Sequence, residues 1–176
     1  MTSTVEIQKF AEDGKLAFES GQYEAAVGKF QEAAAGYTAI NDKVNAAEMM
    51  NNLSVTLLQM GKPQESLAAV LGTEKVFGDI KDPKRQGLAA GNQAAALEAL
   101  GRTDEALAAY ERSAQLFADA GEGDLRSLVL KSSAAIKLRR GKVVEASIRM
   151  LGSLEAKEKP SIFERILKFF LRLIQR

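Results

Sequence analysis

The feature that most constrains this chain is a glycine that recurs every 40 residues, as Gly21, Gly61, Gly101 and Gly141. Five residues after each glycine comes a small side chain, and nine residues after each comes a large apolar one. The small residues are Ala26, Ser66, Ala106 and Ala146, and the large ones are Phe30, Val70, Tyr110 and Met150. A period of this length predicts repeated units stacked on one another, because a single unit cannot bury its own apolar face.

Each unit has the pattern of two helices joined by the glycine turn. Apolar residues recur at helical spacing before the glycines, as in Met49, Leu53 and Leu57. Glycine suits the left-handed backbone that ends such a helix, and Asp82-Pro83 is a typical helix start. We predict first helices over 5–20, 42–60, 83–100 and 123–140, and second helices from about 23, 63, 103 and 143. The expected fold is therefore all-α, with units at about 4–40, 42–80, 83–120 and 123–157.

These residues resemble the tetratricopeptide repeat family. The resemblance is carried by Gly14, by the four segments that open on the recurring glycine, and by the segment Tyr110-Glu-Arg-Ser-Ala-Gln-Leu-Phe. The four segments are Gly21-Gln-Tyr-Glu-Ala-Ala, Gly61-Lys-Pro-Gln-Glu-Ser, Gly101-Arg-Thr-Asp-Glu-Ala and Gly141-Lys-Val-Val-Glu-Ala. The resemblance covers residues 5–157 and implies an α-solenoid of four hairpins with a right-handed superhelix. The longer period also fits HEAT-type repeats, but the glycine turn and the small-residue spacing favour the tetratricopeptide type.

First helices line the concave face of such stacks, so the resemblance also implies where a partner binds. Asn52 and Asn92 each lie nine residues before a recurring glycine, and asparagines at this register hold extended peptides in some relatives. An Asn amide both donates and accepts, so it can pair with both backbone groups of a peptide. The alternative is that these amides bond to a neighbouring helix or to water. The groove candidates are Lys15, Asn52, Gln59, Asn92 and Lys131.

The repeat pattern stops before Pro160, and residues 161–176 have the pattern of a basic amphipathic helix. Ser161 and Glu164 form a capping box, four cations follow one narrow stripe, and large apolar residues cover the rest. The candidates for membrane or partner contact are Ile162, Phe163, Arg165, Ile166, Leu167, Lys168, Phe169, Phe170, Arg172, Leu173, Ile174 and Arg176. At about 1.5 Å per residue this helix spans about 24 Å, short of the ~30 Å apolar core of a bilayer.

The sequence leaves three interpretations of this C-terminal helix open. It fits an interfacial helix on an anionic membrane, where half-burial of its apolar side chains contributes on the order of 10 kcal/mol. It also fits a cap over the exposed end of the last hairpin. In the third interpretation the helix docks in a groove of a partner or pairs with the same helix of a second copy of the chain. The oligomeric state is open for the same reason.

The residues that are missing argue against catalysis. The chain has no Cys and no His, which removes thiol nucleophiles, imidazole bases and the commonest zinc ligands. Because no phosphate-binding glycine loop or acidic cluster is present, we expect no enzyme activity, no cofactor and no metal site. The net charge of +1 is the sum of +4 in residues 157–176 and −3 in the rest. That balance argues against nucleic acid as a partner.

The predicted function is a non-catalytic scaffold for protein–protein interaction that supports the assembly of a complex. The N-terminal residues lack the pattern of a secretory signal, and no apolar run reaches the ~20 residues that a spanning helix needs. We therefore expect a cytoplasmic protein, held peripherally on the cytoplasmic face of a membrane by the C-terminal helix. The alternative is a soluble peptide-binding adaptor whose C-terminal helix caps the solenoid or mediates self-association.

Overall fold

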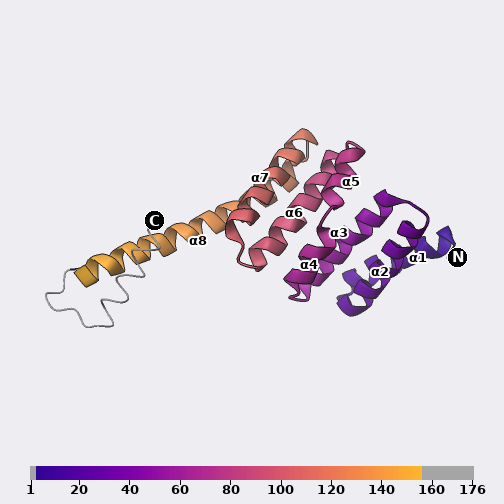
Figure 1. Cartoon of the computed structure of the whole chain (residues 1–176), viewed down its shortest axis with the longest axis horizontal. Helices are drawn as coiled ribbons and strands as arrows, with labels where there is room; N and C mark the ends of the chain where they lie inside the picture. Colours follow the sequence, from indigo (N-terminus) through magenta and orange to yellow (C-terminus); the bar gives the residue numbers. More distant parts are fainter. Residues whose placement is uncertain (1–2, 156–176) are drawn as a thin grey trace. The chain divides into compact units, whose positions relative to one another are not determined.

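The structure, a computed structural model, describes residues 3–155, with side chains as far as Gly141. Every regular element in this range is a helix, which confirms the predicted all-α class (Figure 1). Contacts divide the chain into two units, residues 1–133 and residues 134–176. The helices are α1 (Thr4–Glu19), α2 (Tyr23–Ala39), α3 (Lys43–Gln59), α4 (Pro63–Val70), α5 (Thr73–Asp79), α6 (Pro83–Ala99), α7 (Thr103–Asp119) and α8 (Gly123–Glu155).

In the first unit the same left-handed turn recurs every 20 residues. The residues with positive φ at these turns are Gly21, Asn41, Gly61, Lys81, Gly101 and Gly121. At each turn the next N–H reaches a carbonyl five residues earlier, as from Arg102 to Leu97 at 2.9 Å. This is the Schellman arrangement, which satisfies carbonyls that would otherwise lack a partner at the helix end. The turns predicted at Gly21, Gly61 and Gly101 are confirmed, and the 40-residue period of the sequence is two 20-residue steps.

The helix starts also follow local signals. The side chains of Ser3, Asp42 and Asp82 each accept a hydrogen bond from a backbone N–H three residues later, at 3.2, 3.1 and 2.9 Å. Pro63 and Pro83 occupy first-turn positions, where a missing N–H costs nothing. Local capping therefore fixes where α1, α3 and α6 begin, and the predicted starts of second helices at residues 23, 63 and 103 are confirmed.

Small residues bring the two helices of each hairpin close together. The Oγ atoms of Ser54 and Ser66 lie 3.0 Å apart in the interior of the second hairpin. In the first hairpin, a Cβ on Gly14 would lie 2.8 Å from the ring of Phe30, so no larger residue fits there. Ala26, Ser66 and Ala106, the small residues five positions after the recurring glycines, are all fully buried. Close approach of two helices needs such side chains at the contact.

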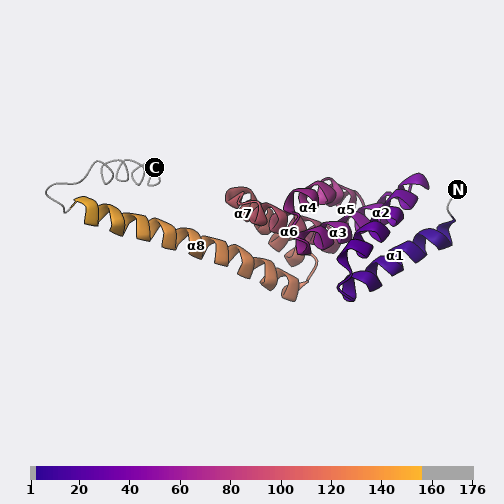
Figure 2. The ribbon, with the colours of Figure 1, turned by 90° about the horizontal axis from the view of Figure 1, so that it is seen from below.

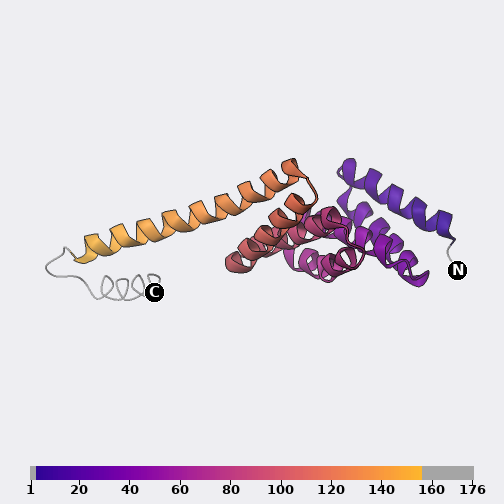
Figure 3. The same cartoon turned by 90° about the horizontal axis from the view of Figure 1, so that it is seen from above.

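Consecutive hairpins pack on one another. Contacts join α2 to α3, both α4 and α5 to α6, and the first helices α3 and α6. In the first unit, α1, α3 and α6 lie on one side and α2, α4, α5 and α7 on the other (Figures 2 and 3). The largest fully buried side chains are Ile7, Phe30, Phe77 and Phe117. Each such side chain contributes roughly 1.5–3 kcal/mol by its removal from water. One cluster of buried side chains extends from Ile7 through Phe30 and Leu53 to Ala69 and so joins the first hairpin to the second.

The second helix of the middle hairpin is in two pieces, a break that the sequence analysis did not predict. It ends as α4 at Val70, Leu71 is extended, and Gly72 is left-handed with φ of +86°. The chain resumes as α5 at Thr73, whose hydroxyl donates to the carbonyl of Val70 at 2.8 Å. Glycine is the residue that reaches this backbone conformation at little cost, so Gly72 permits the break.

The turn predicted at Gly141 is wrong, because α8 runs through this residue without interruption to Glu155. A glycine inside a helix costs only about 1 kcal/mol relative to alanine, so Gly141 does not by itself end the helix. In the second unit the structure describes residues 134–155, all of which belong to α8. The predicted helix over 161–176 and its contact residues lie outside the described residues. No helix within the described range is long and apolar enough to cross a membrane.

The left-handed turns predict opposite effects of mutation at positions with and without a side chain. Lys81→Gly should raise the free energy of unfolding by about 1 kcal/mol, because it relieves a Cβ in a left-handed turn, and Gly101→Ala should lower it by a similar amount. As a control, Gly28→Ala lies within α2 with open space around the added methyl group, so it should stabilise the protein by about 0.5–1 kcal/mol. Urea unfolding followed by circular dichroism measures all three. If Gly101→Ala left the urea midpoint of unfolding unchanged, this would contradict the requirement for glycine in the left-handed turn.

Candidate functional site

A recess of about 250 Å³ opens between the first helices α1 and α3. The residues that line it are Lys15, Phe18, Glu19, Phe30, Asn52 and Val55. Two of the predicted groove residues, Lys15 and Asn52, therefore lie in one site although 37 positions separate them in the sequence. The recess combines apolar walls with one cation, one anion and one amide.

Charged side chains connect the three first helices beside this recess. The ammonium of Lys15 lies 3.8 Å from the carboxylate of Glu48 on α3, and Glu48 lies 3.6 Å from the guanidinium of Arg85 on α6. Arg85 also bonds to Asp82 through its Nε at 2.7 Å. These partly exposed pairs contribute only about 0–1 kcal/mol each. Their main effect is to alternate the sign of charge along the face, with Lys15 as the cation nearest the recess.

The two asparagines that lie nine residues before a recurring glycine are on adjacent first helices, Asn52 on α3 and Asn92 on α6. Both residues are half-buried, and within the described range neither side-chain amide hydrogen-bonds to another residue. Among the described residues, neither amide is therefore bonded to a neighbouring helix. The neighbouring Asn51, which the sequence analysis did not single out, has a structural contact, because its side chain accepts from Thr73 at 3.3 Å.

Three of the five predicted groove residues, Asn92, Gln59 and Lys131, do not line the recess. Gln59 is exposed at the last position of α3, and Lys131 is exposed on α8. Sequence register placed all five candidates on first helices, which is correct, but it did not distinguish the residues of one recess from those farther along each helix. One wall of the recess is Phe30, which packs closely against Gly14. Counting positions back from the recurring glycines does not reveal this contact between two helices.

Three carboxylates act on the buried Tyr37 of α2. Burial raises the pKa of the Tyr37 hydroxyl above its ordinary value, and the negative charges of Asp42, Glu48 and Glu12 raise it further. At Asp82, by contrast, hydrogen bonds from the backbone and side chain of Arg85 hold the carboxyl pKa below its ordinary value.

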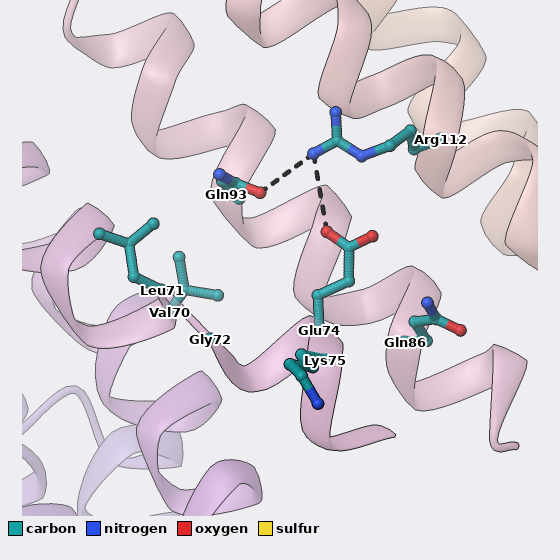
Figure 4. A pocket seen from close by; sticks show the side chains of 8 residues that line it. All are labelled: Val70, Leu71, Gly72, Glu74, Lys75, Gln86, Gln93 and Arg112. Atoms are coloured by element: carbon teal, nitrogen blue, oxygen red, sulfur yellow. Dashed lines mark hydrogen bonds and ion pairs between the residues drawn. The ribbon is translucent and has the colours of Figure 1, made fainter. Parts of the chain in front are cut away.

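A second recess, of about 360 Å³, lies beside the break between α4 and α5 (Figure 4). Its lining residues are Val70, Leu71, Gly72, Glu74, Lys75, Gln86, Gln93 and Arg112. The guanidinium of Arg112 points across it, 3.2 Å from the amide oxygen of Gln93 and 3.6 Å from the carboxylate of Glu74. The only sequence signal for this recess is Gly72, which occupies a register filled by Glu32 and Arg112 in the neighbouring hairpins.

The groups in both recesses are suited to binding by hydrogen bonds, ion pairs and apolar contact. In the part of the chain that the structure describes, no group of three or more acidic side chains could hold a metal ion. The recess between α1 and α3 is the stronger candidate for a protein partner, because its polar groups remain accessible. In the second recess Arg112 is already held by Glu74 and Gln93.

Comparison with known proteins gives no relative, because no family model and no curated protein matches the chain.

Proposed function

We propose that this protein is a non-catalytic scaffold for protein–protein interaction, built as an α-solenoid of the tetratricopeptide type. The observation that carries the proposal is the recess between α1 and α3, in which Lys15 and Asn52 meet apolar side chains. Its support is the agreement of two independent patterns. The register counted from the glycine turns selects Asn52 and Asn92, which are half-buried on adjacent first helices. The packing of the helices brings Lys15 into the same recess as Asn52.

The proposed ligand is an extended segment of a partner protein that lies across the first helices. The amides of Asn52 and Asn92 each offer a donor and an acceptor to the partner's backbone. A side-chain or terminal carboxylate of the partner takes Lys15 as its counter-ion, in competition with Glu48 at 3.8 Å. An apolar side chain of the partner enters between Phe18 and Val55, where removal from water supplies the non-directional part of the affinity.

The groove proposal is tested by removing both amides together. Each hydrogen bond contributes about 0.5–1.5 kcal/mol net, so Asn52→Ala with Asn92→Ala should weaken binding of a partner, first captured with the intact chain, by roughly 10-fold or more. The dissociation constant is measured by titration calorimetry with the purified partner. The matched control is Gln31→Ala with Gln64→Ala, which removes two exposed amides from second helices and should leave the constant unchanged.

The two double variants must keep the helix content and melting temperature of the parent chain for the comparison to hold. Unchanged affinity in the Asn52/Asn92 variant, or an equal loss in the Gln31/Gln64 variant, would remove the groove as the binding surface.

The second part of the proposal concerns location. At helical spacing, the basic residues of 161–176 fall on one narrow side and the apolar residues cover the rest. This sequence pattern supports peripheral attachment to the cytoplasmic face of a membrane. Basic residues near an anionic surface add about 1 kcal/mol each. The scaffold would then hold its protein partners at that surface, where a membrane complex is assembled.

Flotation with anionic liposomes tests the location. The full chain should float with vesicles that contain phosphatidylserine, and a chain that ends at Lys159 should stay at the bottom of the gradient. Neutral vesicles should reduce flotation because they offer no negative charge to the basic residues. High salt should reduce it because it screens the attraction between the basic residues and the anionic lipids. If the full chain does not float, the membrane proposal fails, and a lower melting temperature of the shortened chain would support the cap instead.

A further inference from the structure

The first helices of the first unit change from polar to apolar at one position on their shared face. Counted back from the recurring glycine, the 13th position holds Gln8 in α1, Glu48 in α3, Leu88 in α6 and Leu128 in α8. This position lies one helical turn before that of the two asparagines, so it is on the same side of each helix. At this level the face is therefore polar on α1 and α3 and apolar on α6 and α8.

The leucines on α6 and α8 are accessible. Leu88 keeps 38% of its surface in solvent, and Leu128 keeps 61%. Leu125, one turn before Leu128 on α8, is half-buried. We call these three residues the leucine patch. Single exposed leucines are common on protein surfaces, but exposed leucines at one level of adjacent helices are typical of a surface that binds an apolar group.

The start of α8 packs directly beside α6, which brings the leucines of the two helices onto one surface. All of them belong to the first unit, residues 1–133. A Cβ on Gly91 of α6 would lie 3.7 Å from a methyl group of Val129 on α8. The ammonium of Lys84 lies 2.7 Å from the carboxylate of Glu122, just before α8 begins. These two contacts lie on either side of the exposed leucines along both segments, so the leucine patch is continuous from α6 to α8.

Charge on this face is concentrated away from the leucine patch. The ion pairs that join Lys15 to Glu48, and Glu48 to Arg85, end one helical turn before Leu88. Glu48 is shared between two cations, at 3.8 and 3.6 Å, so it neutralises Lys15 only in part. The face therefore offers a positive charge on α1 and an uncharged apolar surface on α6 and α8.

We propose that the partner segment carries an acidic residue that pairs with Lys15 and a large apolar residue that packs on the leucine patch. This inference rests on the function proposed above and adds the residue types that the face selects at its two ends. An apolar side chain gains free energy when the leucines remove it from water. A charged side chain would lose hydration there without a counter-ion, so the patch favours a leucine, isoleucine, methionine or phenylalanine and rejects charged residues.

The distance between helices sets the spacing of these two residues in the partner. Neighbouring packed helices lie roughly 8–10 Å apart, so the path from α1 across α3 to a point midway between α6 and α8 covers roughly 20–25 Å. An extended chain advances about 3.3 Å per residue. The acidic residue and the apolar residue of the partner are therefore separated by about six to eight positions.

Peptide display tests the selected residue types. The full-length chain selects from a random dodecapeptide phage library, and the enriched peptides are sequenced. We expect an acidic residue with a large apolar residue about six to eight positions away. Selection on Leu88→Gln with Leu128→Gln, the leucine-patch variant, should keep the acidic preference and lose the apolar one. Selection on Lys15→Gln should do the reverse.

The affinity of one enriched peptide supplies a second readout. Replacing its apolar residue by alanine should weaken binding to the parent chain by roughly 10-fold. The same replacement should weaken binding to the leucine-patch variant by less than about 3-fold, because the contact is already absent there. The matched control is Ile80→Gln with Leu130→Gln, which changes two side chains that are each 45% exposed outside the patch. This control should behave as the parent chain does.

The outcomes separate this inference from the proposed function. Peptides that need Asn52 and Asn92 but show no apolar preference overturn the inference and leave the proposed groove standing. Equal affinity of an enriched peptide for the parent chain and the leucine-patch variant does the same. If no peptide is enriched, or if the enriched peptides bind equally well without the two asparagine amides, the proposed function fails and the inference fails with it.

Discussion

The left-handed turn that recurs every 20 residues is the constraint on which the other features of the first unit depend. A shift of one residue in any turn would rotate the next helix by about 100° relative to its partner. The small residues at the hairpin crossing and the large ones beyond it would then point elsewhere, and the contacts of Gly14 with Phe30 and Gly87 with Phe117 would be lost. Constant spacing is therefore what allows one packing solution to be used in successive hairpins.

The same spacing separates the face of each first helix that packs inside the hairpin from the face that we propose binds a partner. The residue seven positions before the glycine packs inside the hairpin, as Ser54 does. The residue nine positions before it, as at Asn52, is two residues away and so points to nearly the opposite side of the helix. Because successive first helices share this register, polar groups on α1, α3 and α6 lie on one surface. The candidate site thus follows from the turns, while its chemistry depends on the few residues at that register.

Sequence alone predicts those parts of the fold that have local causes. The glycine turns at Gly21, Gly61 and Gly101, the helix start at Asp82 and the small residues five positions after each of these glycines could all be predicted in this way. The turns at Asn41 and Lys81 were not, because neither carries the glycine that marks the others. The break at Gly72 and the recess beside it depend on contacts with α3, α6 and α7. Gly141 has the same local signals as Gly21, yet α1 ends before Gly21 whereas α8 continues through Gly141.

The central claim is that the face of the first helices is the surface that binds a partner. The most direct measurement is photo-crosslinking, with a photoreactive phenylalanine at Val55 in the recess or at Gln31 on the exposed side of α2. After irradiation of each complex with the purified partner, mass spectrometry identifies the linked peptides. The account predicts efficient linkage from position 55 and none from position 31. Linkage from position 31 alone, or equally from both, would contradict it.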